Sequence, residues 1–252
     1  MILSAWLVLA AFVSEALKSV LPSGPAWSTL LVDLGTFIPF FLATPLAWRY
    51  LLGNDLALLV NVKGRVLGRR IGVGFGVWIA LCAASTLLDA VIHPADYEYT
   101  FAVAKFAPFA LVTLFLLPVQ AWAEELFFRG WILRWASALP PASQVLISGM
   151  VFAFPHLGNP EASGDALLAL LAYFLLGAGW AYVSVRSGGI ELAMGAHLAN
   201  NAFSLLVVGY NDAALPTAAV FTTTSLNLLT TVLSLAIMVP VFAYATRKQT
   251  AA

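Results

Sequence analysis

The chain has few charged residues. Asp, Glu, Lys and Arg together make up 10% of its 252 residues, whereas about a quarter of an ordinary soluble domain is charged. Hydrophobic residues make up 62%, and the mean hydropathy is +0.93. A soluble protein of this composition would lack the polar side chains needed to cover its core, but a lipid bilayer accepts an apolar exterior. The composition therefore predicts an integral membrane protein.

The sequence also lacks the marks of several other protein classes. The formal net charge is zero and there is no run of basic residues, which argues against nucleic acid as a partner. The one cysteine, Cys82, cannot form a disulfide within the chain and lies in an apolar stretch, so we expect an inert thiol. Residues 1–20 are as apolar as a signal peptide but lack its charged start, and we interpret them as a retained first helix.

Apolar stretches recur along the whole chain. A membrane-spanning helix needs about 20 apolar residues, and eight stretches approach that length, although the fifth is short. They cover residues 2–20, 29–52, 71–92, 101–123, 142–156, 166–185, 190–208 and 221–246. Turn residues such as Pro, Gly and Asn separate most of them. The sequence predicts an all-α, polytopic membrane bundle of about eight transmembrane helices, folded as a single integral membrane domain over residues 1–252.

Basic residues indicate how the bundle is oriented. With eight alternating spans, most of them fall on one side, and Lys18 is the exception. The residues on the common side are Arg49, Lys63, Arg65, Arg69, Arg70, Arg129, Arg134, Arg186, Arg247 and Lys248. Because loops rich in Lys and Arg stay in the cytoplasm, we expect both termini there. The alanine-rich, acid-poor composition favours a prokaryotic cell membrane.

Glycines at short spacing occur in two of the stretches. Gly72, Gly74 and Gly76 alternate in the third, and Gly177 and Gly179 lie in the sixth. Small residues allow helices to approach closely inside a membrane. We therefore expect close helix packing at these positions, with no functional meaning attached to it.

Ionisable side chains inside membrane helices are costly and usually mark function. The first cluster is the glutamate pair Glu124 and Glu125, followed by Arg129. Glu125 and Arg129 are four residues apart, which favours an ion pair along the helix. Glu124 points about 100° away and has no evident local partner. If it faces the bundle interior it could act as a general base; the alternative is an interfacial helix with charges among lipid headgroups.

Two histidines lie in later apolar stretches. Phe152 and His156 share a helix face, and so do His197 and Asn201. Taken alone, each pair is explained as an interfacial histidine or a helix–helix hydrogen bond. Together with the tandem glutamates, they supply what water activation on a carbonyl requires, namely a base, groups that hold the water or a metal, and donors for the oxyanion.

The ordered set of motifs resembles a known family, the CPBP family of intramembrane proteases, which includes the CAAX prenyl endopeptidases of the Rce type and the bacterial Abi proteins. In chain order the matching residues are Glu124, Glu125, Arg129, Phe152, His156, His197 and Asn201. The motifs lie between about residues 122 and 210, and we expect the catalytic core within residues 101–210. The first hundred residues match only as generic membrane helices. The resemblance implies an eight-helix bundle with an interior polar catalytic cavity that opens toward the cytoplasm.

The resemblance also implies roles for the motif residues. Glu124 and His156 would activate a water molecule, and His197 and Asn201 would line an oxyanion site. The second glutamate and the arginine would support them, which agrees with the ion pair derived above. Counting residues places Glu124 near the inner end of its span and His156 near the outer end of the next. For the two to meet, the turn between these spans must be shallow or the fifth helix strongly tilted.

The sequence is compatible with a mechanism that uses a metal cofactor and with one that does not. The family is described both as metalloproteases and as metal-free glutamic proteases, and two histidines with one carboxylate could bind zinc through Glu124, His156 and His197. The sequence has no His-Glu-x-x-His helix. If Glu124 were a ligand, Glu125 would have to be the base while also pairing with Arg129. The metal-free mechanism is therefore favoured.

The function that these features predict is hydrolysis of a peptide bond in a membrane-associated protein. The partners would be membrane lipid and a membrane-anchored or C-terminal peptide substrate. The alternative is a non-enzymatic membrane protein of the same fold, an immunity factor or a transporter. A transporter would usually show repeated halves, and a protein that had lost catalysis would be expected to lack a motif residue; the sequence shows neither.

Overall fold

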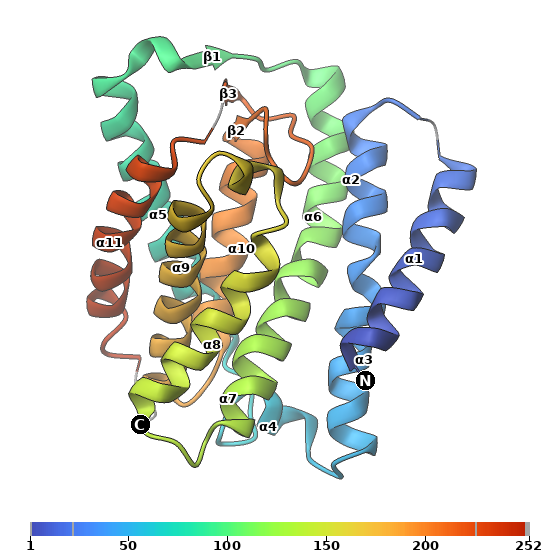
Figure 1. The fold of residues 1–252 in the computed structure, drawn as a ribbon, viewed down its shortest axis with the longest axis vertical. Helices are drawn as coiled ribbons and strands as arrows, with labels where there is room; N and C mark the ends of the chain where they lie inside the picture. The colour runs from blue at the N-terminus through green and yellow to red at the C-terminus, as the bar shows by residue number, and fades with distance from the viewer. Residues whose placement is uncertain (1, 22, 225, 250–252) are drawn as a thin grey trace.

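The computed structural model describes residues 2–21, 23–224 and 226–249, and it is mainly helical (Figure 1). The longer helices are α1 (Ile2–Val20), α2 (Ala26–Gly35), α3 (Phe37–Tyr50), α5 (Gly68–Ile92), α6 (Val103–Glu125), α8 (Pro141–His156), α9 (Ala166–Ser187), α10 (Glu191–Leu206) and α11 (Leu228–Ala245). The shorter elements are α4 (Leu56–Val60), the π-helix η2 (Leu126–Trp131), α7 (Ile132–Trp135) and the 3-10 turns η1 (Pro94–Asp96) and η3 (Pro160–Ser163). Each predicted stretch contains at least one of these helices, so the all-α prediction is confirmed.

Several helical segments are long and apolar enough to cross a bilayer. The described residues contain five: Ala26–Tyr50, Gly68–Ile92, Val103–Trp135, Ala166–Ser187 and Leu228–Ala245. Large apolar side chains on their outer faces are exposed, including Leu87, Val91 and Ile237. A lipid bilayer accepts such exposed apolar side chains. The chain is therefore an integral membrane protein. With α8 and α10 only 16 residues long, the count of eight spans stays a prediction.

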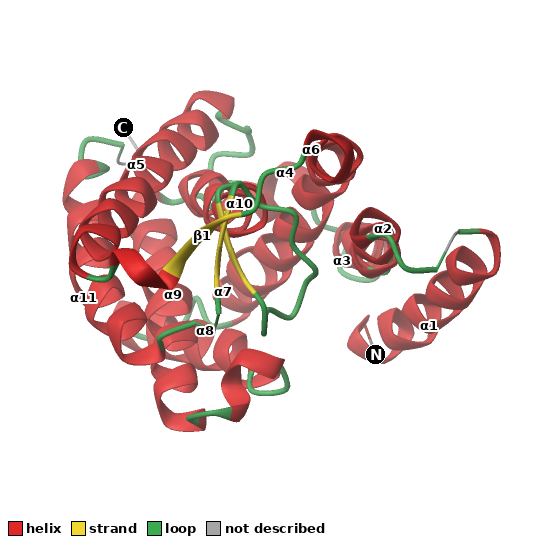
Figure 2. Cartoon of the chain, turned by 90° about the horizontal axis from the view of Figure 1, so that it is seen from above, coloured by secondary structure: helices red, strands yellow, loops and turns green. Residues whose placement is uncertain are grey.

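Helix α10 lies at the centre of the bundle. It packs against α5, α6 and α9, while α8 and α11 pack on α9 (Figures 1 and 2). Helix α1 lies at the edge and contacts α2 and α3. The largest buried cluster includes Trp78, Phe152 and Trp180, which come from α5, α8 and α9. These aromatic rings form an apolar layer next to the motif residues.

Glycines permit two of the helix crossings. A Cβ atom added at Gly74 would overlap the backbone of α10, and one added at Gly177 would lie 3.0 Å from a backbone oxygen of α8. The expectation of close packing is confirmed at these positions. It is wrong at Gly72 and Gly76, where an added Cβ would meet no described atom within 4 Å. The side of α5 that carries Gly74 therefore packs closely on α10, whereas the side that carries Gly72 and Gly76 has no described atom so near.

Three short strands cover one end of the bundle. They are β1 (Tyr97–Tyr99), β2 (Val208–Tyr210) and β3 (Phe221–Thr223), in the order β1-β3-β2. β3 pairs antiparallel with β1 and parallel with β2, and Figure 2 shows the strands lying above the middle of the bundle. This small sheet was not predicted. The prediction that the last helix begins at residue 221 is wrong, because residues 221–223 form β3 and α11 begins at Leu228.

Most basic residues gather at the opposite end, at the ends of α3, α9 and α11, in α7 and in the loop after α4 (Figure 1). Lys18 lies at the sheet end of α1, as expected. Lys105 also lies at the sheet end, at the start of α6, so the prediction that Lys18 is the one exception is wrong. The prediction is also wrong for Arg129, which is fully buried within η2 and not at the basic end. The other residues predicted on the common side follow the predicted asymmetry, and the cytoplasmic position of the termini stays a prediction.

The helix that carries the tandem glutamates continues well past them. α6, η2 and α7 form one segment of 33 residues, so Glu124 lies 11 residues, or ~16 Å, from the end at Trp135. His156 lies 15 residues, or ~22 Å, from the start of α8 at Pro141. Both distances are measured from the same end of the bundle, so the two residues lie at similar depths. The expectation that Glu124 is near the end of its span is wrong. Figure 1 shows α8 running obliquely to α9, which brings the depth of His156 closer to that of Glu124.

Candidate active site

Glu125 and Arg129 form a fully buried ion pair. Nη1 of Arg129 donates to Oε1 of Glu125 at 2.8 Å, and both side chains have no exposed surface. The predicted pair is therefore confirmed. Nη2 of Arg129 donates to the carbonyl of Gly177 at 3.3 Å, and the guanidinium lies 4.3 Å from the ring centroid of Phe152. The arginine thus connects the glutamate helix to α9 through a hydrogen bond and to α8 through a cation–π contact.

The π-helix η2 begins directly after Glu125. A π-turn bonds residue i to i+5, widens the helix and often occurs at functional sites. The hydroxyl of Ser148, on α8, donates to the carbonyl of Phe128 in this turn at 2.9 Å. Gly130 packs against α4, where an added Cβ would lie 2.9 Å from the carbonyl of Leu59. Neighbouring helices therefore hold the widened turn on both sides.

His197 joins the two glutamates. Its Nδ1 lies 2.8 Å from Oε1 of Glu125, and because a carboxylate only accepts, Nδ1 must be the donor. Its Nε2 lies 3.7 Å from Oε2 of Glu124, which is too long for a direct hydrogen bond. The imidazole stacks on Trp180, with ring centroids 4.7 Å apart. Both the orientation of the ring and the position of its free nitrogen are therefore set by neighbours.

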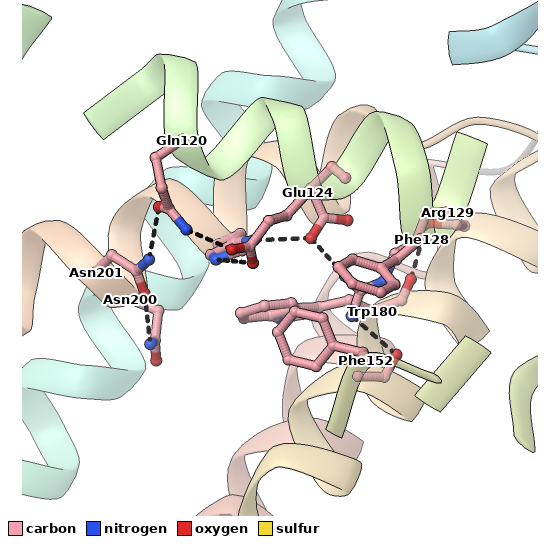
Figure 3. Close-up of polar contacts among 12 residues, drawn as sticks. Gln120, Glu124, Phe128, Arg129, Phe152, Trp180, Asn200 and Asn201 are labelled. Carbon is pink, nitrogen blue, oxygen red and sulfur yellow. Dashed lines mark hydrogen bonds and ion pairs between the residues drawn. The ribbon is translucent and has the colours of Figure 1, made fainter. Parts of the chain in front are cut away.

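A chain of side-chain hydrogen bonds leads to Glu124 from the other direction (Figure 3). The indole of Trp78 donates to Asn200 at 3.2 Å, Asn200 donates to Asn201 at 3.2 Å, Asn201 donates to Gln120 at 3.1 Å, and Gln120 donates to Oε1 of Glu124 at 2.8 Å. We call these four donors the amide relay. Every donor points toward the carboxylate, so each bond polarises the next.

Glu124 receives the end of this relay. The residue is 7% exposed, and its Oε2 has no hydrogen-bond partner among the described residues. One carboxylate oxygen is therefore held by Gln120 while the other faces His197. Sequence reasoning missed Gln120, although its position four residues before Glu124 places the two on one helix face. It also missed Asn200 and Trp78, for which the local sequence carries no comparable signal.

His156 lies beside the network and shares no hydrogen bond with it among the described residues. Its Nδ1 lies 2.7 Å from the carbonyl of Phe152, so this nitrogen is the donor and Nε2 stays free. The imidazole ring lies against Phe152 at 4.5 Å, as predicted, and against Tyr173 at 4.3 Å. The Phe152 ring also contacts His197, at 6.0 Å. The two histidines are thus connected through one aromatic ring.

The structure therefore places five of the six predicted site residues in one continuous polar network, and the sixth, His156, adjoins it through ring contacts. The five are Glu124, Glu125, Arg129, His197 and Asn201. The first three come from α6 and η2, and the last two from α10.

The zinc alternative needs three ligands around one point. Among the described residues there is no group of three His, Cys, Asp or Glu side chains placed to hold a metal ion. Each histidine donates through Nδ1 and keeps Nε2 free, which by itself would suit a metal ligand. The misfit lies in the grouping, because Glu124, His156 and His197 are not placed together as a metal-binding set among the described residues.

A cavity of about 290 Å³ lies between α5, α9, α10 and α11, below the strands. Asn200 and Tyr173 line it, and none of the six predicted site residues does. Asn200 belongs to the amide relay and Tyr173 contacts His156, so the cavity reaches the immediate neighbours of the network. A cavity lined by the motif residues themselves stays a prediction.

Comparison with known proteins identifies the segment that carries this network. Residues 105–203 match the family model described as type II CAAX prenyl endopeptidase Rce1-like. Through this segment the chain is similar to the Rce1-like family. The resemblance inferred from the motifs is confirmed. All six predicted site residues, and Gln120 and Asn200, lie within the Rce1-like segment, whereas Trp78 lies outside it.

One relative among curated proteins is the uncharacterized protein YyaK of Bacillus subtilis (strain 168). It is 35% identical over 185 residues, which cover 71% of this chain and 62% of the relative. The chain thus spans less than two thirds of the length of YyaK. No solved structure matches the chain.

Proposed function

We propose that this protein is an intramembrane endopeptidase that hydrolyses a peptide bond of a membrane-associated protein, with Glu124 as the general base. The observation that carries the proposal is the 3.7 Å approach of Glu124 Oε2 and His197 Nε2 inside an Rce1-like segment. Both residues are buried, and each side chain is held by a hydrogen bond on its other polar atom, Glu124 by Gln120 and His197 by Glu125. Such fixed, water-poor positions are what a general base requires.

The gap between these two atoms suits a water molecule. A separation of 3.7 Å is too long for a direct bond but allows one water to bond both groups. Both are acceptors, because Oε2 belongs to a carboxylate and the proton of His197 is on Nδ1. The water would donate its two hydrogens to them and keep a lone pair for the substrate carbonyl. Glu124 would take one proton as the C–O bond forms, and would pass it to the amine that leaves when the C–N bond breaks.

The other motif residues support this chemistry in different ways. His156 keeps a free Nε2 and remains, as the resemblance implies, a second group for the water or the substrate. Asn201 donates to Gln120, so its amide acts here by holding the base in position through Gln120. Arg129 neutralises Glu125 and leaves Glu124 as the carboxylate without a cationic partner among the described side chains.

The direct test replaces Glu124 by glutamine. Glu124→Gln keeps the shape and the bond from Gln120 but removes the base, so cleavage of a fluorescence-quenched peptide library in proteoliposomes should fall by roughly 10²–10⁴-fold. The midpoint of thermal unfolding should stay close to that of the wild type. The control is Glu98→Gln, an exposed residue of β1, which should retain full activity. Full cleavage by Glu124→Gln would refute the proposal.

A chelator distinguishes the metal-dependent mechanism. Because Glu124, His156 and His197 are not placed as a metal-binding group among the described residues, we expect activity to persist after treatment with chelator, and purified protein to contain no stoichiometric zinc. Activity that disappears with the chelator and returns with zinc would contradict the glutamate mechanism, while the assignment as a protease would stand.

A further inference from the structure

The cavity beside the amide relay is rich in hydroxyl groups. We call it the α5–α11 groove, after the two helices at its sides. All four surrounding helices contribute hydroxyl side chains to its lining, including Ser85, Thr86, Tyr173, Ser204, Thr231 and Ser234. Hydroxyls both donate and accept hydrogen bonds. Apolar side chains such as Leu176, Phe203 and Leu235 line it as well, so the lining suits a ligand that has both polar backbone groups and apolar side chains.

The inner end of the groove approaches the proposed site from two sides. On one side Asn200 lines the groove and donates to Asn201, the next member of the amide relay that ends at Glu124. On the other side Tyr173 lines the groove and its ring lies 4.3 Å from that of His156. A chain held in the groove would therefore end between the neighbours of the base and the neighbours of the free histidine.

The length of the groove can be estimated from its helices. Its lining runs from Cys82 to Asp89 on α5 and from Asn227 to Met238 on α11, which corresponds to ~10 Å and ~16 Å at 1.5 Å per residue. An extended peptide advances ~3.3 Å per residue, so about three to five residues fit. Their amides and carbonyls need partners inside a membrane protein. The hydroxyls of Tyr173, Ser204 and Thr231 already bond to Glu161, Tyr210 and Asn227, so Ser85, Thr86 and Ser234 would be the partners in the groove.

The outer end of the α5–α11 groove is acidic. Asp89 and Asp96 line the groove near the strands, whereas no Lys, Arg or His among the described residues lines it. Asp89 already accepts from Tyr97 at 2.7 Å and lies 3.1 Å from His93. Asp96 is exposed and makes no side-chain bond that the structure records. The outer end is therefore complementary to a basic side chain.

We propose that the α5–α11 groove binds an extended segment of the substrate, about three to five residues long, with Lys or Arg placed at its outer end beside Asp96. The segment would deliver the adjoining peptide bond to Glu124. This inference rests on the proposed function and adds a substrate class to it, namely peptide segments that are extended and basic at one end.

Binding is tested separately from cleavage. The probe is a short fluorescent peptide of Ala, Ser and Val that ends in a pair of lysines, and its twin ends in a pair of glutamates. Binding to Glu124→Gln protein in nanodiscs is measured by fluorescence anisotropy. The lysine peptide should bind more tightly than the glutamate peptide, and the difference should shrink at high salt. Equal binding of the two peptides would overturn the assignment of a basic residue to the outer end.

Filling the groove tests its position. In the same background, Ser234→Trp should weaken binding of the lysine peptide at least about tenfold, because an indole would occupy the space. The matched control is Ala236→Trp, on the same helix but exposed and outside the lining, which should bind normally. Ser85→Trp fills the groove from α5 and serves if Ser234→Trp does not fold. Normal binding by a folded groove-filling variant would overturn the proposal.

Charge reversal tests the outer end. Asp96→Lys should weaken binding of the lysine peptide about fivefold, as expected for an exposed ion pair, while Glu98→Lys, two residues away and outside the lining, should not. Wild-type protein is then assayed for cleavage of the same peptide. Cleavage that Ser234→Trp leaves unchanged would overturn the groove proposal alone. Binding that Ser234→Trp abolishes, without cleavage by the wild type, would support the groove and overturn the proposed function.

Discussion

Among single residues, the buried charges of the site depend most strongly on one another. Glu124, Glu125, Arg129 and His197 are all nearly or fully buried. Removing a charge from water costs several kcal/mol, so each group needs a partner nearby. Arg129 and His197 both donate to one oxygen of Glu125. The second glutamate is therefore the centre that holds the cationic and imidazole groups, and the first stays available for chemistry.

Replacing the arginine should expose this dependence. Arg129→Ala would leave the Glu125 carboxylate buried without its charge partner, which we expect to lower the free energy of unfolding by about 3–5 kcal/mol and to reduce the yield of folded protein. The measurement is thermal unfolding of purified protein in detergent. Arg65→Ala, at an exposed position, is the control and should leave stability unchanged. A fully stable Arg129→Ala protein would contradict this account.

The amide relay makes a second residue-scale prediction. Gln120→Leu keeps the size of the side chain but leaves Glu124 Oε1 and the Asn201 amide without their partners. Loss of a hydrogen bond to a charged group is worth about 1.5–3 kcal/mol, so we expect kcat to fall by about 10–100-fold while KM changes little. Steady-state kinetics in proteoliposomes measure both constants. Gln144→Leu, at a partly exposed position on α8, is the control; an unchanged kcat in Gln120→Leu would argue against positioning through this residue.

At the scale of elements, the crossing of α5 and α10 sets the position of His197, because α10 carries it. Gly74 on α5 and Gly195 on α10 leave no room for a side chain: an added Cβ would overlap the backbone of the other helix at both. Close contact of this kind depends on small residues in membrane helices. The distance between α10 and α6, and with it the Glu124–His197 gap, therefore depends on glycines outside the motifs.

Two substitutions on one helix test this. Gly74→Ala should separate α5 from α10 and lower the free energy of unfolding by about 1–3 kcal/mol. Gly72→Ala, where the new methyl group meets open space, should instead raise it by about 0.5–1 kcal/mol, because alanine is the better helix former. Thermal unfolding of the two variants gives the sign directly. Stabilisation of equal size in both would show that helix propensity, not packing, governs these positions, and destabilisation of equal size in both would contradict the open space beside Gly72.

At the scale of the whole molecule, the basic end and the sheet end differ in charge and in structure. The basic end carries most Lys and Arg residues, and the sheet end carries the strands and the outer part of the α5–α11 groove. Cytoplasmic loops of membrane proteins are rich in Lys and Arg. We therefore expect the sheet end, and with it the outer end of the α5–α11 groove, to face away from the cytoplasm, whereas the family resemblance implies a catalytic cavity that opens toward it.

Cysteine labelling in a bacterial host checks this orientation. In whole cells a membrane-impermeant maleimide should label Glu98→Cys protein, at the sheet end, and not Arg65→Cys protein, at the basic end; inside-out vesicles should show the reverse. The native Cys82 is buried, so the wild-type protein should stay unlabelled in both preparations. Labelling of Arg65→Cys in intact cells would mean that the bundle is inserted the other way.

The sequence by itself determined the properties that composition and local spacing control. Its apolar content and periodic stretches were sufficient for a helical membrane bundle, because a bilayer demands long apolar helices. The Glu125–Arg129 ion pair and the Phe152–His156 contact also followed, since residues four apart share a helix face whatever the rest of the chain does.

Only the tertiary structure decided which residue on one helix meets which residue on another. His197 meets Glu125 across 72 positions of sequence, and Asn201 meets Gln120 across 81. Adjacent helical residues point about 100° apart, so a small rotation of α10 would turn a different side chain toward α6. Helix rotation and crossing are set by packing over the whole bundle, which no local pattern encodes. For the same reason the three-residue strands, stable only because the bundle brings them together, could not be read from the chain.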